Sequence, residues 1–168
     1  MGYKMSSKLS DEERKRISIF GSPENRLGFL LWQVNNLWQK KQQTELKKIN
    51  LTHVQFVLLA SIVWMSIEDK KINQLTLSRF AKTDKMMTSQ VIRKLVEKRL
   101  IIRYRNPEDS REFILEATEN GINLAKRAIK IVEEVDVNFF NSISEQDRKS
   151  LVSILLRLSL SGISSDNK

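Results

Sequence analysis

The stretch that decides the fold is residues 84–111, DKMMTSQVIRKLVEKRLIIRYRNPEDSR. Its first half repeats apolar residues at helical spacing, which predicts an amphipathic helix. The run 100–105 is β-branched and partly alternates with arginine, which predicts a strand. The run 106–110 combines proline with short polar residues, as tight turns do. The residues expected on the buried side of the helix are Met87, Val91 and Leu95, with Ile92 or Val96 beside them.

The opposite side of this helix is polar and basic. Short hydrogen-bonding side chains lie near its N-terminus and cations lie along it, which is the arrangement that a helix in the DNA major groove requires. Gln90 is suited to adenine, and Arg93 to guanine or to phosphate. The predicted DNA contacts on this helix are Lys85, Met86, Thr88, Ser89, Gln90, Arg93 and Lys94.

The flanking segments predict a winged helix-turn-helix. Residues 74–83, QLTLSRFAKT, form a short helix just before the predicted reading helix, and two short helices with a tight connection make a helix-turn-helix. Residues 112–117 form a second β-favouring run after the turn, so a hairpin follows. A plain surface ribbon would not explain why Arg103, Arg105 and Arg111 gather there.

The remaining segments are predicted to be helical, so the fold class is mainly α with a small β-hairpin wing. Residues 23–49 carry an apolar stripe up to Trp38 and then turn polar, so we expect the far end of this helix to be exposed. Thr52 is expected to open the next helix, whose body FVLLASIVWMSI at 56–67 is apolar nearly all round, which predicts the central helix. Residues 118–139 and 144–161 each carry a further apolar stripe.

Several segments begin with residues that favour helix N-termini. Gly162 is expected to end the last helix. Two capping boxes are expected, one from Ser10 to Glu13 and one from Thr52 to Gln55. Single N-cap residues are expected at Asn73, at either Thr83 or Asp84, at Thr118 and at Ser144.

Composition narrows the function classes. The 168 residues carry a net charge of +9, which suits a polyanionic partner. The excess lies in residues 1–112, where 22 basic residues face 12 acidic ones. There is no cysteine and one histidine, which excludes thiolate or His-rich metal sites, and no cofactor is expected. No Gly-rich phosphate loop or nucleophile–base pair is visible, which argues against an enzyme. No membrane span or signal peptide is visible, which predicts a cytoplasmic protein.

Five segments together resemble the MarR family of winged-helix transcriptional regulators. They are LTHVQF at 51–56, the reading helix at 89–95, RLI at 99–101, NPEDSR at 106–111 and LEATENG at 115–121. The chain departs from the family pattern in having Asn106 where the wing usually begins with Asp. It also has Arg99 or Leu100 where a glycine is common before the wing, which puts the turn geometry there in question.

The resemblance implies a homodimer that binds double-stranded DNA at a pseudo-palindrome. Residues 1–168 would form one domain, with dimerisation helices at 22–49 and 118–160, a DNA-binding lobe at 51–117 and an N-terminal extension at 1–21. It implies that Arg111 reaches the minor groove or its phosphates and that Asp109 positions it, while Arg103 and Arg105 flank the groove.

The resemblance also implies repression relieved by a small aromatic effector. Its pocket residues would be Trp32, Asn36, His53, Phe56 and Trp64. For His53 a structural role is the stronger hypothesis. The alternative function is a non-regulatory winged-helix module for architectural DNA binding or protein interaction.

Overall fold

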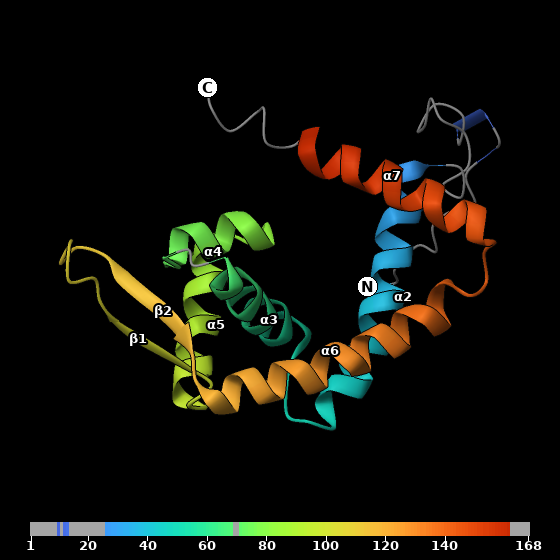
Figure 1. Ribbon diagram of the computed structural model, residues 1–168. Helices are drawn as coiled ribbons and strands as arrows, with labels where there is room; N and C mark the ends of the chain where they lie inside the picture. Colours follow the sequence, from blue (N-terminus) through green and yellow to red (C-terminus); the bar gives the residue numbers. More distant parts are fainter. Residues whose placement is uncertain (1–9, 11, 14–25, 69–70, 162–168) are drawn as a thin grey trace, which may run out of the picture. The chain divides into compact units, whose positions relative to one another are not determined.

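A computed structural model describes residues 10, 12–13, 26–68 and 71–161. Figure 1 shows the helices and the one hairpin of these residues. No described helix is long and apolar enough to cross a membrane. The expected helix end at Gly162 and most of the N-terminal extension lie outside the described residues. The elements are α2 (Leu27–Lys47), α3 (His53–Ile67), α4 (Gln74–Ala81), α5 (Lys85–Glu97), β1 (Ile101–Arg105), β2 (Phe113–Ala117), α6 (Glu119–Phe140) and α7 (Glu145–Ser161).

The chain divides into two compact units, residues 1–40 and residues 41–168, and α2 contributes to both. Our expectation for α2 was wrong at its far end. The polar second half is the buried half, because Gln42 and Leu46 are fully covered. The Gln42 amide nitrogen donates to Asp136 of α6 over 3.0 Å. This partner lets a polar side chain enter the interior, which the local pattern could not reveal.

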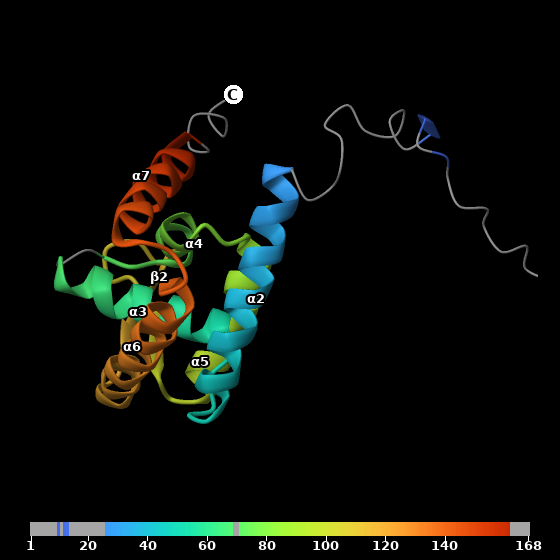
Figure 2. The ribbon, with the colours of Figure 1, turned by 90° about the vertical axis from the view of Figure 1, so that its right-hand side faces the viewer.

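α3 is the centre of the second unit, as its all-round apolar sequence predicts. It packs against α4, α5, α6 and β2. Its buried apolar residues join those of the surrounding elements in one core. Figure 2 shows α3 lying alongside α6 in this unit. The core residues that α3 contributes are Leu58, Leu59, Ile62 and Met65.

The predicted caps are present where the structure describes them. Thr52 and Gln55 form a capping box at the start of α3, and Asn73 forms another with Thr76 at the start of α4. Of the two candidates for α5, Asp84 is the cap. Thr118 caps α6. Ser10 and Glu13 exchange the two hydrogen bonds of a capping box, and Ser144 accepts from the amide of Asp147.

The turn between α5 and the wing keeps a left-handed geometry without glycine. Arg99 has φ 55°, a conformation that glycine adopts at no steric cost. The amide of Leu100 donates to the carbonyl of Leu95, and the amide of Arg99 donates to that of Val96. These bonds form a Schellman motif, so the chain turns sharply into β1 although Arg99 is strained.

β1 and β2 form an antiparallel hairpin in which Ile101 pairs with Ala117 and Arg105 with Phe113. The predicted strands and turn are therefore confirmed. The hairpin extends beyond α5 in Figure 1. Two backbone bonds join its base to the lobe. The amide of Leu115 donates to the carbonyl of Ile72, and the amide of Thr118 donates to that of Leu100.

Candidate nucleic-acid interface

The exposed side of α5 carries three side chains in one row. Met86, Gln90 and Arg93 are separated by four and three residues, so they lie on the same face of the helix. All three are exposed. Met86 occupies the second position of α5, where the helix begins at the Asp84 cap. The row therefore offers an apolar group, an amide and a guanidinium in order from the helix N-terminus.

Thr88 was predicted to contact DNA, and the structure does not support this prediction. It is fully buried. Its hydroxyl donates to the carbonyl of Asp84 over 2.7 Å and lies 2.8 Å from the hydroxyl of Thr83. A side chain with these partners inside the lobe does not reach DNA. The buried side of α5 consists of Thr88, Ile92 and Leu95, while Met87 and Val91 are only half-buried. The expected buried face is therefore rotated by about one residue, and Ile92 rather than Val96 belongs to it.

The other α5 residues of the predicted set differ in accessibility. Lys85 is exposed and Ser89 is half-buried. Lys94 is exposed, and its ammonium group lies 2.8 Å from the carboxylate of Glu97, one turn away on the surface. An exposed pair of this kind is weak and screened by salt, so Lys94 stays available for a phosphate.

The side chain of Asn106 stabilises the turn of the wing through two hydrogen bonds. It is buried although it lies in the turn. Its side-chain oxygen accepts from the amide of Glu108 over 3.0 Å. Its side-chain nitrogen donates to Glu112 Oε2 over 3.3 Å. Asp109 accepts from the backbone amide of Arg111 over 2.9 Å. Asp109 thus fixes the backbone at Arg111, which is a narrower role than the predicted aiming of its side chain.

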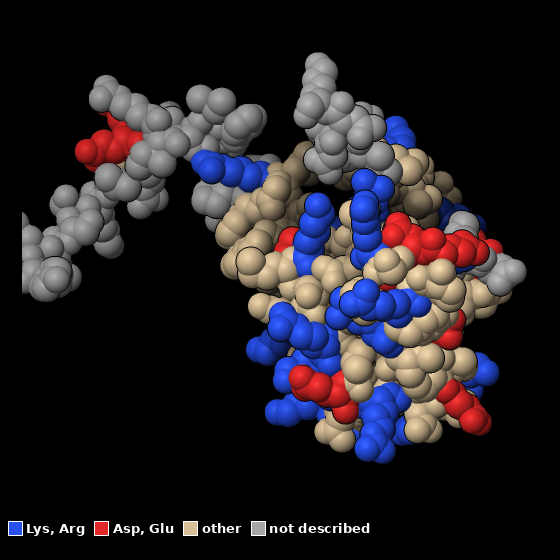
Figure 3. Space-filling view, turned by 90° about the vertical axis from the view of Figure 1, so that its left-hand side faces the viewer, with Lys and Arg blue, Asp and Glu red and all other residues tan. Residues whose placement is uncertain are grey.

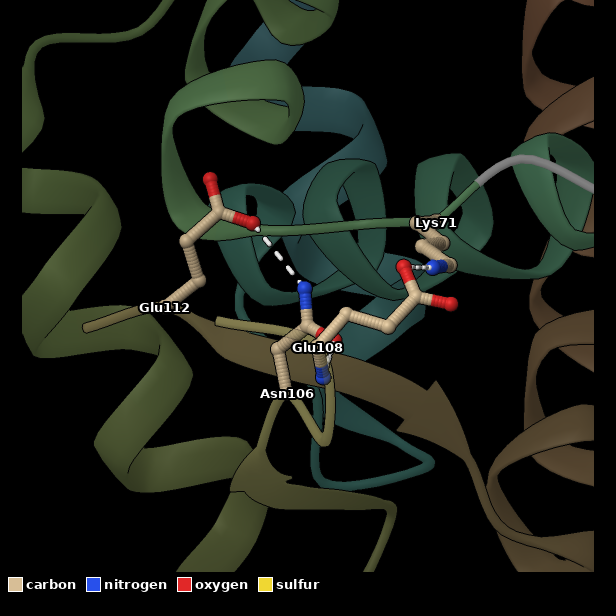
Figure 4. Close-up of polar contacts among 4 residues, drawn as sticks. All are labelled: Lys71, Asn106, Glu108 and Glu112. Atoms are coloured by element: carbon tan, nitrogen blue, oxygen red, sulfur yellow. Dashed lines mark hydrogen bonds and ion pairs between the residues drawn. The ribbon is translucent and has the colours of Figure 1, made fainter. Parts of the chain in front are cut away.

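Two contacts tie the wing to the segment before α4. The second carboxylate oxygen of Glu112, Oε1, accepts from the Asn73 side chain over 3.1 Å. Glu108 forms an ion pair with Lys71. Figure 4 shows Glu108 beside Lys71 and Glu112 beside Asn106. Glu112 therefore joins the wing to the residue that caps α4. Residues 73 and 112 are far apart in sequence, and we did not predict their contact.

The wing arginines share one aromatic support. The guanidinium carbon of Arg103 lies 3.9 Å from the ring centroid of Phe113, and that of Arg105 lies 5.7 Å from it. Cations over a ring face are attracted to its quadrupole. Arg105 also donates to the carbonyl of Ser110 over 3.3 Å. Figure 3 shows that Lys and Arg side chains gather on the side of the molecule that carries the wing.

A hollow of about 260 Å³ lies between the wing and the start of α4. Arg103 and Arg111 both line it, so the fold brings these two predicted contacts together. Asn73 and Gln74 line the opposite side, at the N-terminus of α4. Helix N-termini and arginines both favour anions, whereas Glu112, which also lines the hollow, opposes them. The two arginines are therefore the groups of this hollow that suit a phosphate.

The predicted effector residues are not gathered in one unit. Trp32 and Asn36 belong to the first unit, and the other three belong to α3 in the second. Trp64 is 60 % exposed, while Phe56 packs against the core. None of the five lines the hollow of about 390 Å³ that lies between residues 41–45 and α6. The effector pocket therefore stays a prediction.

His53 is half-buried at the start of α3, and its amide donates to the side chain of Gln43 over 2.9 Å. Burial lowers the pKa of His53, while the charge of Asp136 opposes this shift. These surroundings fit the structural role that the sequence favours. Among the described residues, no group of three or more His, Asp or Glu could hold a metal ion.

The order α3, α4, α5 and hairpin, with a polar face on α5 and three exposed arginines on the wing, defines the class of winged helix-turn-helix proteins. Comparisons with known proteins agree. A mutant of MarR from E. coli, solved in complex with operator DNA, has a TM-score of 0.71 and 21 % identity, and covers 79 % of this chain and 92 % of that one. At this identity the likeness concerns the fold.

Sequence relatives define the family. Residues 40–128 match the model for the transcriptional regulators SarA/Rot. The uncharacterized HTH-type transcriptional regulator YdcH of Bacillus subtilis (strain 168) is 41 % identical over 130 residues, 77 % of this chain and 88 % of that protein. The HTH-type transcriptional regulator SarZ of Staphylococcus haemolyticus (strain JCSC1435) is 33 % identical over 132 residues, 78 % of this chain and 85 % of SarZ. The chain belongs to the SarA/Rot family of transcriptional regulators, and its fold is similar to that of MarR.

Proposed function

We propose that this protein binds a specific pseudo-palindromic operator as a homodimer and represses transcription from it. The observation that carries this proposal is the row Met86, Gln90 and Arg93 on α5, beside a wing whose arginines are exposed. The row provides three different base-reading groups, which a purely architectural binder does not need. The cations of the wing would hold the neighbouring backbone and make binding salt-dependent.

Exposed apolar faces support the homodimer. The first half of α2 exposes large apolar side chains, including Trp32 at 61 %. α7 has no buried residue and exposes Val152, Ile154, Leu155, Leu156, Leu158 and Leu160. Apolar surface of this extent marks an interaction site. A two-fold pair would present two α5 helices to successive major grooves, about 34 Å apart.

Selection of bound duplexes from a random library by the purified chain tests the operator. We expect an enriched palindrome with half-sites about one helical turn apart. Equal affinity for selected and scrambled duplexes would instead indicate the architectural alternative. Sedimentation tests the homodimer: Leu158→Glu, which places a charge on the exposed face of α7, should shift the chain towards monomer and weaken operator binding.

The wing is tested with Arg111→Ala and a control. We expect Arg111→Ala to lower operator affinity by about 1–3 kcal/mol, measured by gel-shift titration. Arg127→Ala removes an exposed cation from α6, which is outside both α5 and the wing, and should leave affinity unchanged. Unchanged binding by a folded Arg111→Ala variant would remove Arg111 from the interface.

Regulation by a small aromatic molecule rests on the aromatic residues Trp32, Phe56 and Trp64. An effector that binds one lobe spacing better than another would shift the population and release DNA. Transcription in vitro from the selected operator tests the sign, and a panel of aromatic acids tests the effector. The effector hypothesis is wrong if tryptophan fluorescence responds to no compound that releases DNA.

A further inference from the structure

Met86 is the one apolar side chain among the exposed residues at positions 85–94 of α5. It is 73 % exposed, and its neighbours Lys85, Gln90 and Arg93 are exposed and polar or cationic. A single exposed methionine on a protein surface is ordinary. Its position is not, because it stands at the second residue of α5, in the row that faces away from the lobe. The N-terminal residues of a recognition helix are those that contact base edges.

We infer that Met86 determines specificity by contacting the 5-methyl group of a thymine in each half-site. This inference rests on the proposed function. The thymine methyl is the one apolar group that base pairs present in the major groove, and apolar side chains recognise it. A thioether is flexible and polarisable, so it can adapt to a methyl group without exact placement. Its own hydrogen-bonding capacity is too weak for it to read a donor or an acceptor.

An apolar protein partner is a poorer occupant for Met86. The row that continues from Met86 along α5 holds Gln90, Arg93 and Glu97, which are polar or charged, and the exposed Val96 lies off this row, near the end of the helix. The polar and cationic neighbours would be desolvated by an apolar partner without compensation. In a DNA groove, bases and phosphates can accept or donate hydrogen bonds to these polar neighbours, while a thymine methyl group can contact the thioether.

The row also fixes the order of contacts. An α-helix rises about 1.5 Å per residue, so Met86 and Arg93 are separated by about 10 Å along the axis. This distance corresponds to about three base-pair steps of DNA at about 3.4 Å each. We expect a half-site in which the critical thymine lies about three steps from the base or phosphate that Arg93 contacts. Gln90 would contact a base between them.

Replacing thymine by uracil removes only the methyl group and leaves base pairing intact, which gives a direct test. Each thymine of the selected operator is replaced in turn, symmetrically in both half-sites. For the unmodified chain we expect one position per half-site where affinity falls about four-fold, the effect of losing one buried methyl group. Met86→Ala should bind the thymine and uracil duplexes equally. Met86→Leu, which keeps an apolar side chain, should retain discrimination at that position.

Gln90→Ala is the matched control. Gln90 lies in the same row of α5, so its replacement should lower operator affinity. The variant should nevertheless keep the full discrimination between thymine and uracil. The inference is overturned if the unmodified chain responds to no uracil substitution, or if Met86→Ala keeps the same response. Failure to enrich any duplex would overturn both this inference and the proposed function. An enriched operator without a uracil response would overturn this inference alone.

Discussion

Asn106 and Glu112 close the turn at the tip of the wing through both backbone and side chains. The amide of Asn106 donates to the carbonyl of Glu112 over 2.9 Å, and the side-chain nitrogen of Asn106 donates to Glu112 Oε2 over 3.3 Å. The departure from the aspartate usual in MarR regulators therefore has a local explanation. An aspartate at 106 would place a second carboxylate against Glu112.

Asn106→Asp should destabilise the protein by about 1–2 kcal/mol, because a buried donor is replaced by a like charge. Urea unfolding at neutral pH measures the loss. The double variant with Glu112→Gln should recover part of it, since the amide of Gln can donate to the new carboxylate. A coupling energy of zero in this cycle would show that the two side chains do not interact.

The substitution Thr88→Val tests whether Thr88 stabilises the core or contacts DNA. The substitution keeps the shape and removes the hydroxyl that donates to the carbonyl of Asp84. We expect a loss of about 1–2 kcal/mol in unfolding free energy, with operator affinity of the folded protein little changed. Gln90→Ala should show the reverse pattern. Lower operator affinity for Thr88→Val than for Gln90→Ala, at full folding, would restore Thr88 to the interface.

Gly121 is required by a close approach of two backbones. A Cβ at this position would lie 1.9 Å from the carbonyl oxygen of Leu100, which also accepts hydrogen bonds from Thr118. Gly121→Ala should lower the unfolding free energy by about 1–3 kcal/mol, seen as a reduced melting temperature. Gly28→Ala is the control, because nothing lies within 4 Å of a Cβ there. That exposed helical site should gain up to about 1 kcal/mol.

We expect His53 to lower the unfolding free energy of the protein at acid pH. Burial lowers the pKa of its imidazole in the folded state, so the unfolded chain binds a proton more readily. The contribution of neutral His53 is present above its unfolded pKa of about 6.5 and is lost as pH falls through the folded pKa. His53→Gln should reduce the fall in unfolding free energy below about pH 6.5. Parallel pH profiles for the two proteins would exclude His53 as the cause.

The sequence by itself determined the elements of this protein and their order. Capping residues such as Thr52, Asn73 and Thr118 act on amides two or three residues away, so their effect is local and visible in the sequence. α3 is apolar on nearly all sides, which favours a central position, because most of its surface is stabilised by burial. Proline and short polar residues at 106–110 specify a tight turn through their own backbone preferences.

Only the tertiary structure decided which polar groups are buried and what they bind. Gln42 appears exposed in the pattern but is buried, and its side-chain nitrogen donates to Asp136, 94 residues further along the chain. Thr88 also appears exposed, but the packing of the lobe buries it against Asp84 and Thr83. The clamp from Glu112 to Asn73 joins segments 39 residues apart. Hydrogen bonds between distant segments depend on the packing of the whole lobe. Sequence periodicity records the burial of apolar surface and carries no information about such partners.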